Sequence, residues 1–208
     1  MKSVIYRSIE FLIIFILIPI SFSIHYAGWI KMIIGSVGFL YIVYVLLKIE
    51  KLKFKVSSHL NWKPFWKQTF VKFIGIAIIA TLFVWFTNKE VLFNVILEKP
   101  KLWIFILFIY IFFSVYPQEL IYRTFYFQRY SKLFNNNSLF IFINAIVFSL
   151  AHIFFRNTLV IVLTFLGGLL FALTYSKTQS TLLVSIEHAV YGCWLFTVGM
   201  GEMLGFPA

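Results

Sequence analysis

The sequence predicts an all-α protein, a polytopic bundle of about seven membrane-spanning helices. Its 208 residues are 62% hydrophobic and only 12% charged, whereas soluble domains are about half apolar and about a quarter charged. The runs 11–24 and 73–86 contain no acidic or basic side chain. We therefore treat the whole chain, 1–208, as a single membrane domain.

Seven apolar segments approach the ~20 residues that an α-helix needs to cross a bilayer. They lie at 9–26, 30–48, 69–87, 101–127, 138–155, 158–176 and 181–200. Residues 1–99 supply the N-terminal helices and one long basic loop, and residues 100–200 form a second region. The only cysteine, Cys193, excludes an intramolecular disulfide.

Lysine and arginine predict the orientation. The loop 49–68 contains five lysines and one acid, Glu50, so the positive-inside rule places this loop and the N-terminus in the cytoplasm. The lysines crowd the ends of apolar segments, so the net charge of +11 indicates contact with anionic lipid head groups and not with nucleic acid. We expect a multi-pass protein of a bacterial inner membrane.

The fourth segment contains Glu119 and Arg123, which are four residues apart and share one face of a helix. Pairing makes such charges tolerable in a low dielectric, so a purely structural ion pair is one interpretation. Pro117 lacks the N–H that would bond one turn back, and it should open the backbone beside the carboxylate.

The fifth segment contains His152, and the seventh contains Glu187 and His188. Ionisable groups at membrane depth are expensive and point to function. With Glu119 they predict one buried polar site. Two imidazoles and a carboxylate could position a water molecule, or bind zinc with an open coordination position.

Three motifs occur in order along these segments. They read Gln118-Glu119-Leu-Ile-Tyr-Arg123, Phe148-Ser-Leu-Ala-His152 and His188-Ala-Val-Tyr-Gly192. In order and spacing they resemble the Glu-Glu-x-x-x-Arg, Phe-x-x-x-His and His-x-x-x-Asn motifs of the CPBP family, which contains CAAX prenyl proteases and bacteriocin-processing or abortive-infection proteins. The resemblance covers about residues 100–200, which would then be the protease core.

This resemblance implies an intramembrane endopeptidase acting on a membrane-associated peptide or protein. Glu119 corresponds to the second motif glutamate and Arg123 to its pairing arginine, while His152 and His188 correspond to the two histidines. A glutamic-type mechanism requires no cofactor. In a metal-dependent mechanism, His152, His188 and Glu119 would be the zinc ligands.

The chain departs from the family pattern at two positions. Gln118 replaces the first motif glutamate, usually taken as the base, and Gly192 replaces the asparagine. Glu119 or Glu187 could act as the base instead, or the site could belong to a silent pseudoprotease that binds membrane peptides. A small proton-coupled transporter is a third alternative, although the chain shows no duplicated half.

Overall fold

The computed structural model describes residues 4–52 and 60–205, with the side chain of Leu204 left out. Helix is the only regular structure in this described part of the chain, so the predicted all-α class is confirmed. The chain folds into two compact units, Met1–Val56 with Leu120–Gln179, and Ser57–Glu119 with Ser180–Ala208. We describe each unit by itself.

Six helical segments of the described residues are long and apolar enough to cross a membrane. They are Val4–Phe22, Gly28–Ile49, Trp62–Thr87, Pro100–Leu133, Asn137–Phe155 and Thr158–Thr178. The seventh predicted segment forms a helix of 17 residues, Thr181–Thr197. That helix is about 26 Å long, slightly less than the ~30 Å of a hydrocarbon core, so the count of seven is not confirmed.

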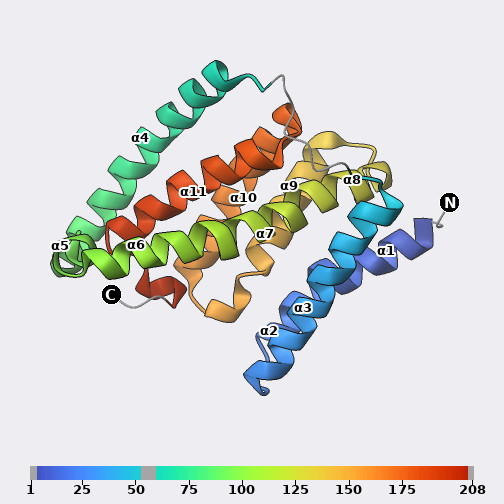
Figure 1. The fold of residues 1–208 in the computed structure, drawn as a ribbon, viewed down its shortest axis with the longest axis horizontal. Helices are drawn as coiled ribbons and strands as arrows, with labels where there is room; N and C mark the ends of the chain where they lie inside the picture. The colour runs from blue at the N-terminus through green and yellow to red at the C-terminus, as the bar shows by residue number, and fades with distance from the viewer. Residues whose placement is uncertain (1–3, 53–59, 206–208) are drawn as a thin grey trace. The chain divides into compact units, whose positions relative to one another are not determined.

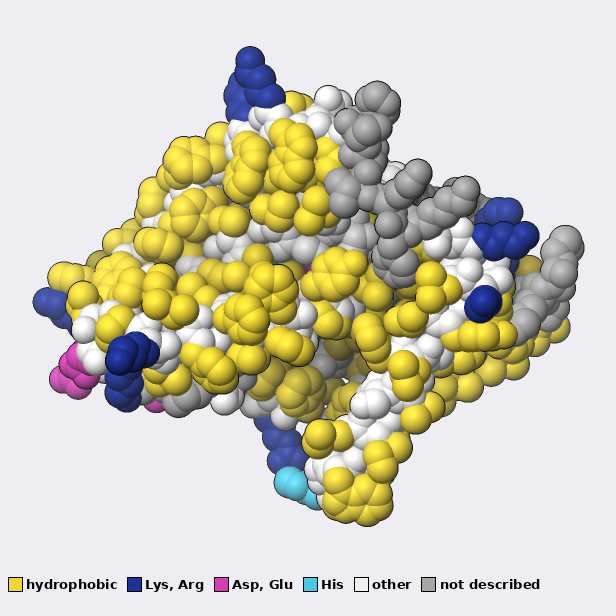
Figure 2. Space-filling model, in the orientation of Figure 1, with side chains coloured by type: hydrophobic (Ala, Val, Ile, Leu, Met, Phe, Trp, Pro, Cys, Tyr) yellow, Lys and Arg dark blue, Asp and Glu magenta, His cyan; other side chains and the backbone are white. Residues whose placement is uncertain are grey.

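Large apolar side chains cover the outer faces of these helices, as Figure 2 shows for the visible face. Phe86 is 80% exposed and Met32 is 73% exposed. Exposed apolar surface on this scale would be unfavourable in water but is the normal outer face of a helix in lipid. The chain is therefore a multi-pass integral membrane protein.

The first unit contains the N-terminal helices and the middle of the chain. Its elements are α1 (Val4–Leu12), η1 (Ile13–Leu17), α2 (Ile18–Phe22), α3 (Gly28–Tyr44), η2 (Val45–Ile49), η5 (Leu120–Phe125), α8 (Tyr126–Tyr130), η6 (Ser131–Leu133), α9 (Asn137–Leu150), η7 (Ile153–Phe155) and α10 (Thr158–Thr178). Helices α9 and α10 pack against each other, and α1 runs beside α3 (Figure 1). Phe15 lies at the centre of this unit, with its ring against Tyr122, Tyr126 and Tyr130.

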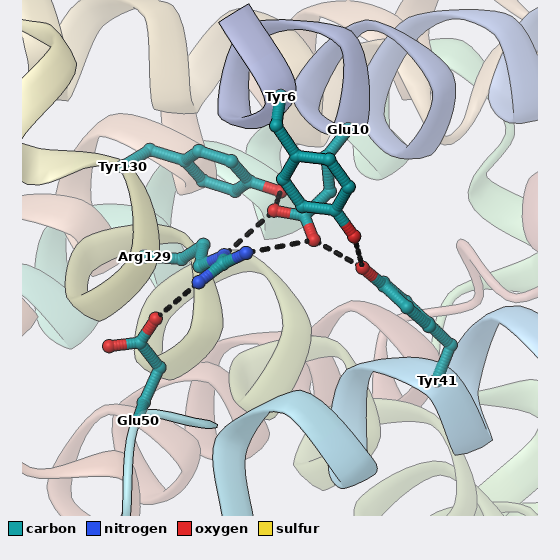
Figure 3. A network of polar contacts seen from close by, with 6 residues as sticks. All are labelled: Tyr6, Glu10, Tyr41, Glu50, Arg129 and Tyr130. Carbon is teal, nitrogen blue, oxygen red and sulfur yellow. Dashed lines mark hydrogen bonds and ion pairs between the residues drawn. The ribbon is translucent and has the colours of Figure 1, made fainter. Parts of the chain in front are cut away.

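A buried ion network joins three parts of this unit (Figure 3). Arg129 is 1% exposed, and its Nε donates to Glu10 Oε2 at 2.7 Å. Its Nη1 donates to Glu50 Oε1, also at 2.7 Å. The hydroxyls of Tyr41 and Tyr130 donate to the Glu10 carboxylate as well. Arg129 therefore links α1 and the end of η2 to α8.

The second unit is built around α11 (Thr181–Thr197), which packs against α4 and against the helix that contains α6, η4 and α7 (Figure 1). Its other elements are α4 (Trp62–Thr87), η3 (Lys89–Val91), α5 (Asn94–Glu98), α6 (Pro100–Ile109), η4 (Tyr110–Val115), α7 (Tyr116–Glu119) and η8 (Glu202–Leu204). Val95, Ile106 and Phe196 contribute to its buried apolar core. This packing places α11 against the segment that contains Glu119.

Helix α4 begins at Trp62, seven residues before the predicted start of its segment at 69. Lys63 and Lys67 therefore lie in the helix, whereas the sequence placed them in the basic loop. Pro64 lies in the first turn of the helix, where a proline is tolerated, so it does not prevent this early start. The centre of that loop, with Lys53, Lys55 and His59, lies outside the described residues.

Candidate active site

Pro117 opens the helix in which Glu119 lies, as predicted. The π-helical turn η4 precedes the proline, and the N–H of Tyr116 bonds five residues back, to Ile111. A second π-helical turn, η5, begins directly after Glu119. Turns of this kind widen the helix and are frequent at functional sites. They change the direction of the side chains on either side of Pro117.

Glu119 and His188 form a hydrogen-bonded pair inside the second unit. The distance between Glu119 Oε1 and His188 Nδ1 is 2.7 Å. The carboxylate is fully buried, and His188 is 7% exposed. When Glu119 is ionised it only accepts hydrogen bonds, so Nδ1 carries the hydrogen and Nε2 is the acceptor nitrogen of the neutral ring. This arrangement is an acid–base pair, in which a carboxylate orients an imidazole and stabilises its protonated form.

Glu187 also belongs to this unit, but it contacts α4. Its Oε1 accepts from Lys72 Nζ at 2.7 Å and from the Tyr191 hydroxyl at 2.9 Å, and its side chain is fully buried. Neighbouring residues on a helix point in different directions. The catalytic role predicted for Glu187 stays a prediction, and the contacts observed join α11 to α4.

Gln118 directly precedes Glu119 in the sequence, and Gly192 follows His188 by one helical turn. Gln118 Nε2 donates to Ser114 Oγ at 2.7 Å, while its Oε1 is buried and has no hydrogen-bond partner among the described residues. At Gly192, a β-carbon would overlap the hydroxyl of Tyr110. Both departures from the family pattern are thus accommodated by side chains of η4.

Arg123 and His152 lie in the first unit. Arg123 is fully buried and donates from Nη1 to Asn144 Oδ1 at 2.6 Å, with its guanidinium 4.7 Å from the centre of the Phe148 ring. The structure does not test the predicted ion pair with Glu119, or the gathering of all four motif residues at one site. Both stay predictions.

His152 lies at the end of α9, where its Nδ1 is 2.8 Å from the carbonyl oxygen of Phe148. A carbonyl can only accept, so Nδ1 carries the hydrogen and Nε2 is the acceptor of the neutral imidazole. Asn144, missed in the sequence, precedes Phe148 and His152 at intervals of four residues. That helical spacing is the signal that could have identified it.

The described residues contain no group of three or more His, Cys, Asp or Glu side chains that could hold a metal ion. The Glu119–His188 pair supplies two ligands, whereas catalytic zinc sites usually have three from the protein. The pair alone does not fit zinc, and the mechanism proposed below involves no metal. Zinc binding by His152, His188 and Glu119 together stays a prediction.

A cavity of ≈ 380 Å³ lies in the first unit, and no motif residue lines it. It is lined by Phe22, Ser23, His25, Lys31, Phe154 and Arg156. The Arg156 guanidinium donates to Ser23 O at 2.8 Å and lies 2.9 Å from His25 Nε2. These bonds give the polar residues structural partners, and we assign no function to this cavity.

These features define a class, a polytopic membrane protein with a buried carboxylate–imidazole pair on facing apolar helices. A comparison with protein families finds a match: residues 100–194 are similar to the type II CAAX prenyl endopeptidase Rce1-like family. The CPBP resemblance seen in the three motifs is therefore confirmed over this region. No curated protein and no solved structure matches the chain.

The match indicates a membrane protease that acts on a membrane-associated protein or peptide. It covers η4, Glu119 and most of α11, including the Glu119–His188 pair. It gives no support to the transporter alternative.

Proposed function

We propose that the protein is an intramembrane endopeptidase in which the Glu119–His188 pair activates water for hydrolysis of a peptide bond. The observation that carries this proposal is the 2.7 Å contact between Glu119 Oε1 and His188 Nδ1 in a fully buried setting. Replacing both members of a buried polar pair by well-packed apolar residues is often neutral or stabilising, so packing alone does not require the Glu119–His188 pair.

The proton of the attacking water goes to Nε2 of His188, because Nδ1 is engaged with Glu119. Glu119 keeps the imidazole in this tautomer and stabilises the imidazolium that forms. The imidazolium then gives its proton to the nitrogen of the departing amine. General acid–base catalysis by a positioned group contributes about 10²–10⁴-fold to a rate. Glu119 therefore acts through His188, whereas the family resemblance alone suggested the carboxylate as the direct base.

The other predicted site residues have supporting roles in this proposal. Arg123, held by Asn144, orders the helix beyond Glu119, and Gln118 bonds to Ser114 within the wide turn. Glu187 anchors α11 to α4 through Lys72. His152 stays a candidate for a second catalytic imidazole.

The substrate is a peptide or protein segment at the membrane, whose scissile bond must enter the bilayer to reach the buried pair. The lysine-rich loop supports a cytoplasmic N-terminus and a basic surface for anionic head groups, and a bacterial inner membrane is the location we propose.

The test compares new peptide termini in membranes from cells that express the native chain, Glu119→Gln or His188→Gln at equal levels. Glu202→Gln is the matched control, because Glu202 is an exposed glutamate of the same unit. We expect native-specific termini to persist in the control and to vanish in both site variants.

Termini that survive both site variants would overturn the proposal. A Gln118→Glu variant addresses the pseudoprotease alternative, which the replacement of the first motif glutamate favours. If the native chain and both site variants give the same termini while Gln118→Glu creates new ones, the natural site is silent.

A further inference from the structure

Tyr110 brings a hydroxyl to the Glu119–His188 pair from a direction that the sequence motifs do not reveal. It is the first residue of the π-helical turn η4, and it is more than nine-tenths buried. Its ring meets the His188 ring edge-on, with 6.0 Å between centroids, and packs on Phe196 at 4.7 Å.

The hydroxyl of Tyr110 lies directly against the backbone of Gly192. A β-carbon on Gly192 would overlap Oη and the two nearest ring carbons, so the tyrosine can take this position only because residue 192 is glycine. Gly192 follows His188 by four residues, which places both on one face of α11. The phenol oxygen therefore lies about one helical turn from the imidazole.

No hydrogen bond of this hydroxyl is seen within the described part of the chain, and its oxygen is not one of the fully buried polar atoms that lack a partner. Its neighbours are mostly apolar. Hydroxyls in mostly apolar surroundings normally have a hydrogen-bond partner, so a bound ligand is a suitable partner for this one. The edge-on contact between the Tyr110 and His188 rings places the phenol close to the acid–base pair. An unused donor at this point is suited to a ligand that brings an oxygen atom.

We propose that Tyr110 is a further catalytic residue, whose O–H donates a hydrogen bond to the carbonyl oxygen of the scissile peptide bond. The proposal rests on the proposed protease function. The family motif has an asparagine at the position of Gly192 on α11. In this chain the hydroxyl of Tyr110, on η4, would act as the hydrogen-bond donor in place of that amide. Gly192 is then the residue that admits the phenol, and its lack of a side chain is not a defect of the site.

In the reaction, the water oxygen forms a bond to the carbonyl carbon and its proton passes to His188 Nε2. The π electrons of the carbonyl move to its oxygen, and Tyr110 O–H stabilises the negative charge there. When the intermediate collapses, the C=O bond re-forms, the C–N bond breaks, and the imidazolium proton goes to the nitrogen. The products are a carboxylic acid and an amine, and Tyr110 keeps its own proton.

The first test is Tyr110→Phe, which removes one oxygen atom and retains the ring that packs on His188 and Phe196. The substrate is a reporter peptide that contains the cut sequence found in the terminus comparison. Loss of one preorganised oxyanion donor lowers kcat by about 10²–10³-fold, and we expect this loss with little change in KM. Tyr116→Phe, an exposed tyrosine of the same helix, should retain native kcat.

A paired substitution tests the spatial relation directly. Gly192→Asn alone should be inactive, because the new side chain overlaps Tyr110. The double variant Tyr110→Ala/Gly192→Asn removes that overlap and supplies an amide donor in the same space. It should be at least tenfold more active than Tyr110→Ala alone.

Native kcat in Tyr110→Phe, measured beside an inactive Glu119→Gln, would overturn the role of Tyr110 and leave the protease proposal intact. Native activity in both variants would overturn the protease proposal itself. A double variant no more active than Tyr110→Ala, with both folded by thermal melting, would show that the donor does not act from this position.

Discussion

Replacing Arg129 with methionine should destabilise the protein by about 3 kcal/mol. Arg129 is 1% exposed and makes 2.7 Å contacts with both Glu10 and Glu50 (Figure 3). Removing one partner of a buried ion pair costs about 3–5 kcal/mol, because the other charge stays buried without compensation.

Two features place the expected value at the lower end of this range. The Glu50 side chain is 19% exposed, so it can turn toward water or lipid head groups. Glu10 still accepts hydrogen bonds from Tyr41 and Tyr130 when the guanidinium is gone. The remaining cost therefore arises chiefly because the buried Glu10 carboxylate loses its positively charged partner.

The free energy of unfolding can be measured in bicelles by steric trapping, for the native chain and for Arg129→Met. Lys132→Met is the matched control, since Lys132 is an exposed cation three residues away, and it should change stability by less than about 0.5 kcal/mol.

A double variant, Arg129→Met with Glu10→Gln, completes the cycle. It should cost at least about 1 kcal/mol less than the sum of the two single changes, because the buried charge is removed together with its partner. Strictly additive costs, or a loss below about 1 kcal/mol for Arg129→Met, would refute a buried network that links α1 to α8.

The remaining predictions concern the second unit. Lys72→Met should lower the free energy of unfolding by about 3 kcal/mol in the same bicelle assay, because Glu187 is fully buried beside it, while Lys72→Arg should keep most of the stability; equal losses for both would contradict an ion pair. Gly192→Ala should lower the thermal midpoint by several degrees through overlap with Tyr110, and Tyr110→Ala in the same chain should relieve that loss; a neutral Gly192→Ala would contradict the close contact. A zinc chelator should leave peptide cleavage by the purified protein within twofold of its initial rate, because the buried acid–base pair supplies only two ligands; a loss that added zinc restores would establish a metal enzyme.

The apolar segments could be predicted because length and composition alone determine whether a helix can span a bilayer. The start of α4 could not, since the amphipathic residues from Trp62 to Gln68 are compatible with a loop or with a helix. Packing and the backbone hydrogen bonds of the helix decide between the two. Similarly, the proline at 117 predicts an opened backbone, but only the structure shows wide turns on both sides of Glu119.

The residues of the candidate site could be named from sequence because three short motifs occur in order. Their contacts could not be derived in the same way. Glu187 and His188 are neighbours, yet one contacts Lys72 on α4 and the other Glu119 on α7, because adjacent helix residues point apart. The fit of Tyr110 against Gly192 joins residues far apart in the chain, and no local pattern encodes it.

Glu10 is a further residue whose contacts could not be predicted from its position in the sequence. In the sequence it lies near the end of an apolar segment, where an acid is unremarkable, but in the structure it is 6% exposed and bonded to Arg129. The useful signal was that the N-terminus, near Glu10, and the loop that contains Glu50 are both predicted on the cytoplasmic side of the membrane. Charges expected at one membrane depth can pair even when their segments are far apart in sequence.

The departure from the family pattern at Gly192 favours a rearranged site over an abandoned one. A silent site has no need of a buried carboxylate–imidazole pair, which apolar residues could replace together with little or no cost to stability. Here Glu119 is retained and bonded to His188, and the side chain missing at Gly192 is matched by a phenol that fills its place. A glycine that had merely lost its function would leave space beside His188, whereas this one is tightly occupied by a hydrogen-bond donor. The loss of an amide on α11 and the presence of Tyr110 on η4 therefore belong to one arrangement. The double variant Tyr110→Ala/Gly192→Asn is the most direct way to distinguish a rearranged active site from an abandoned one.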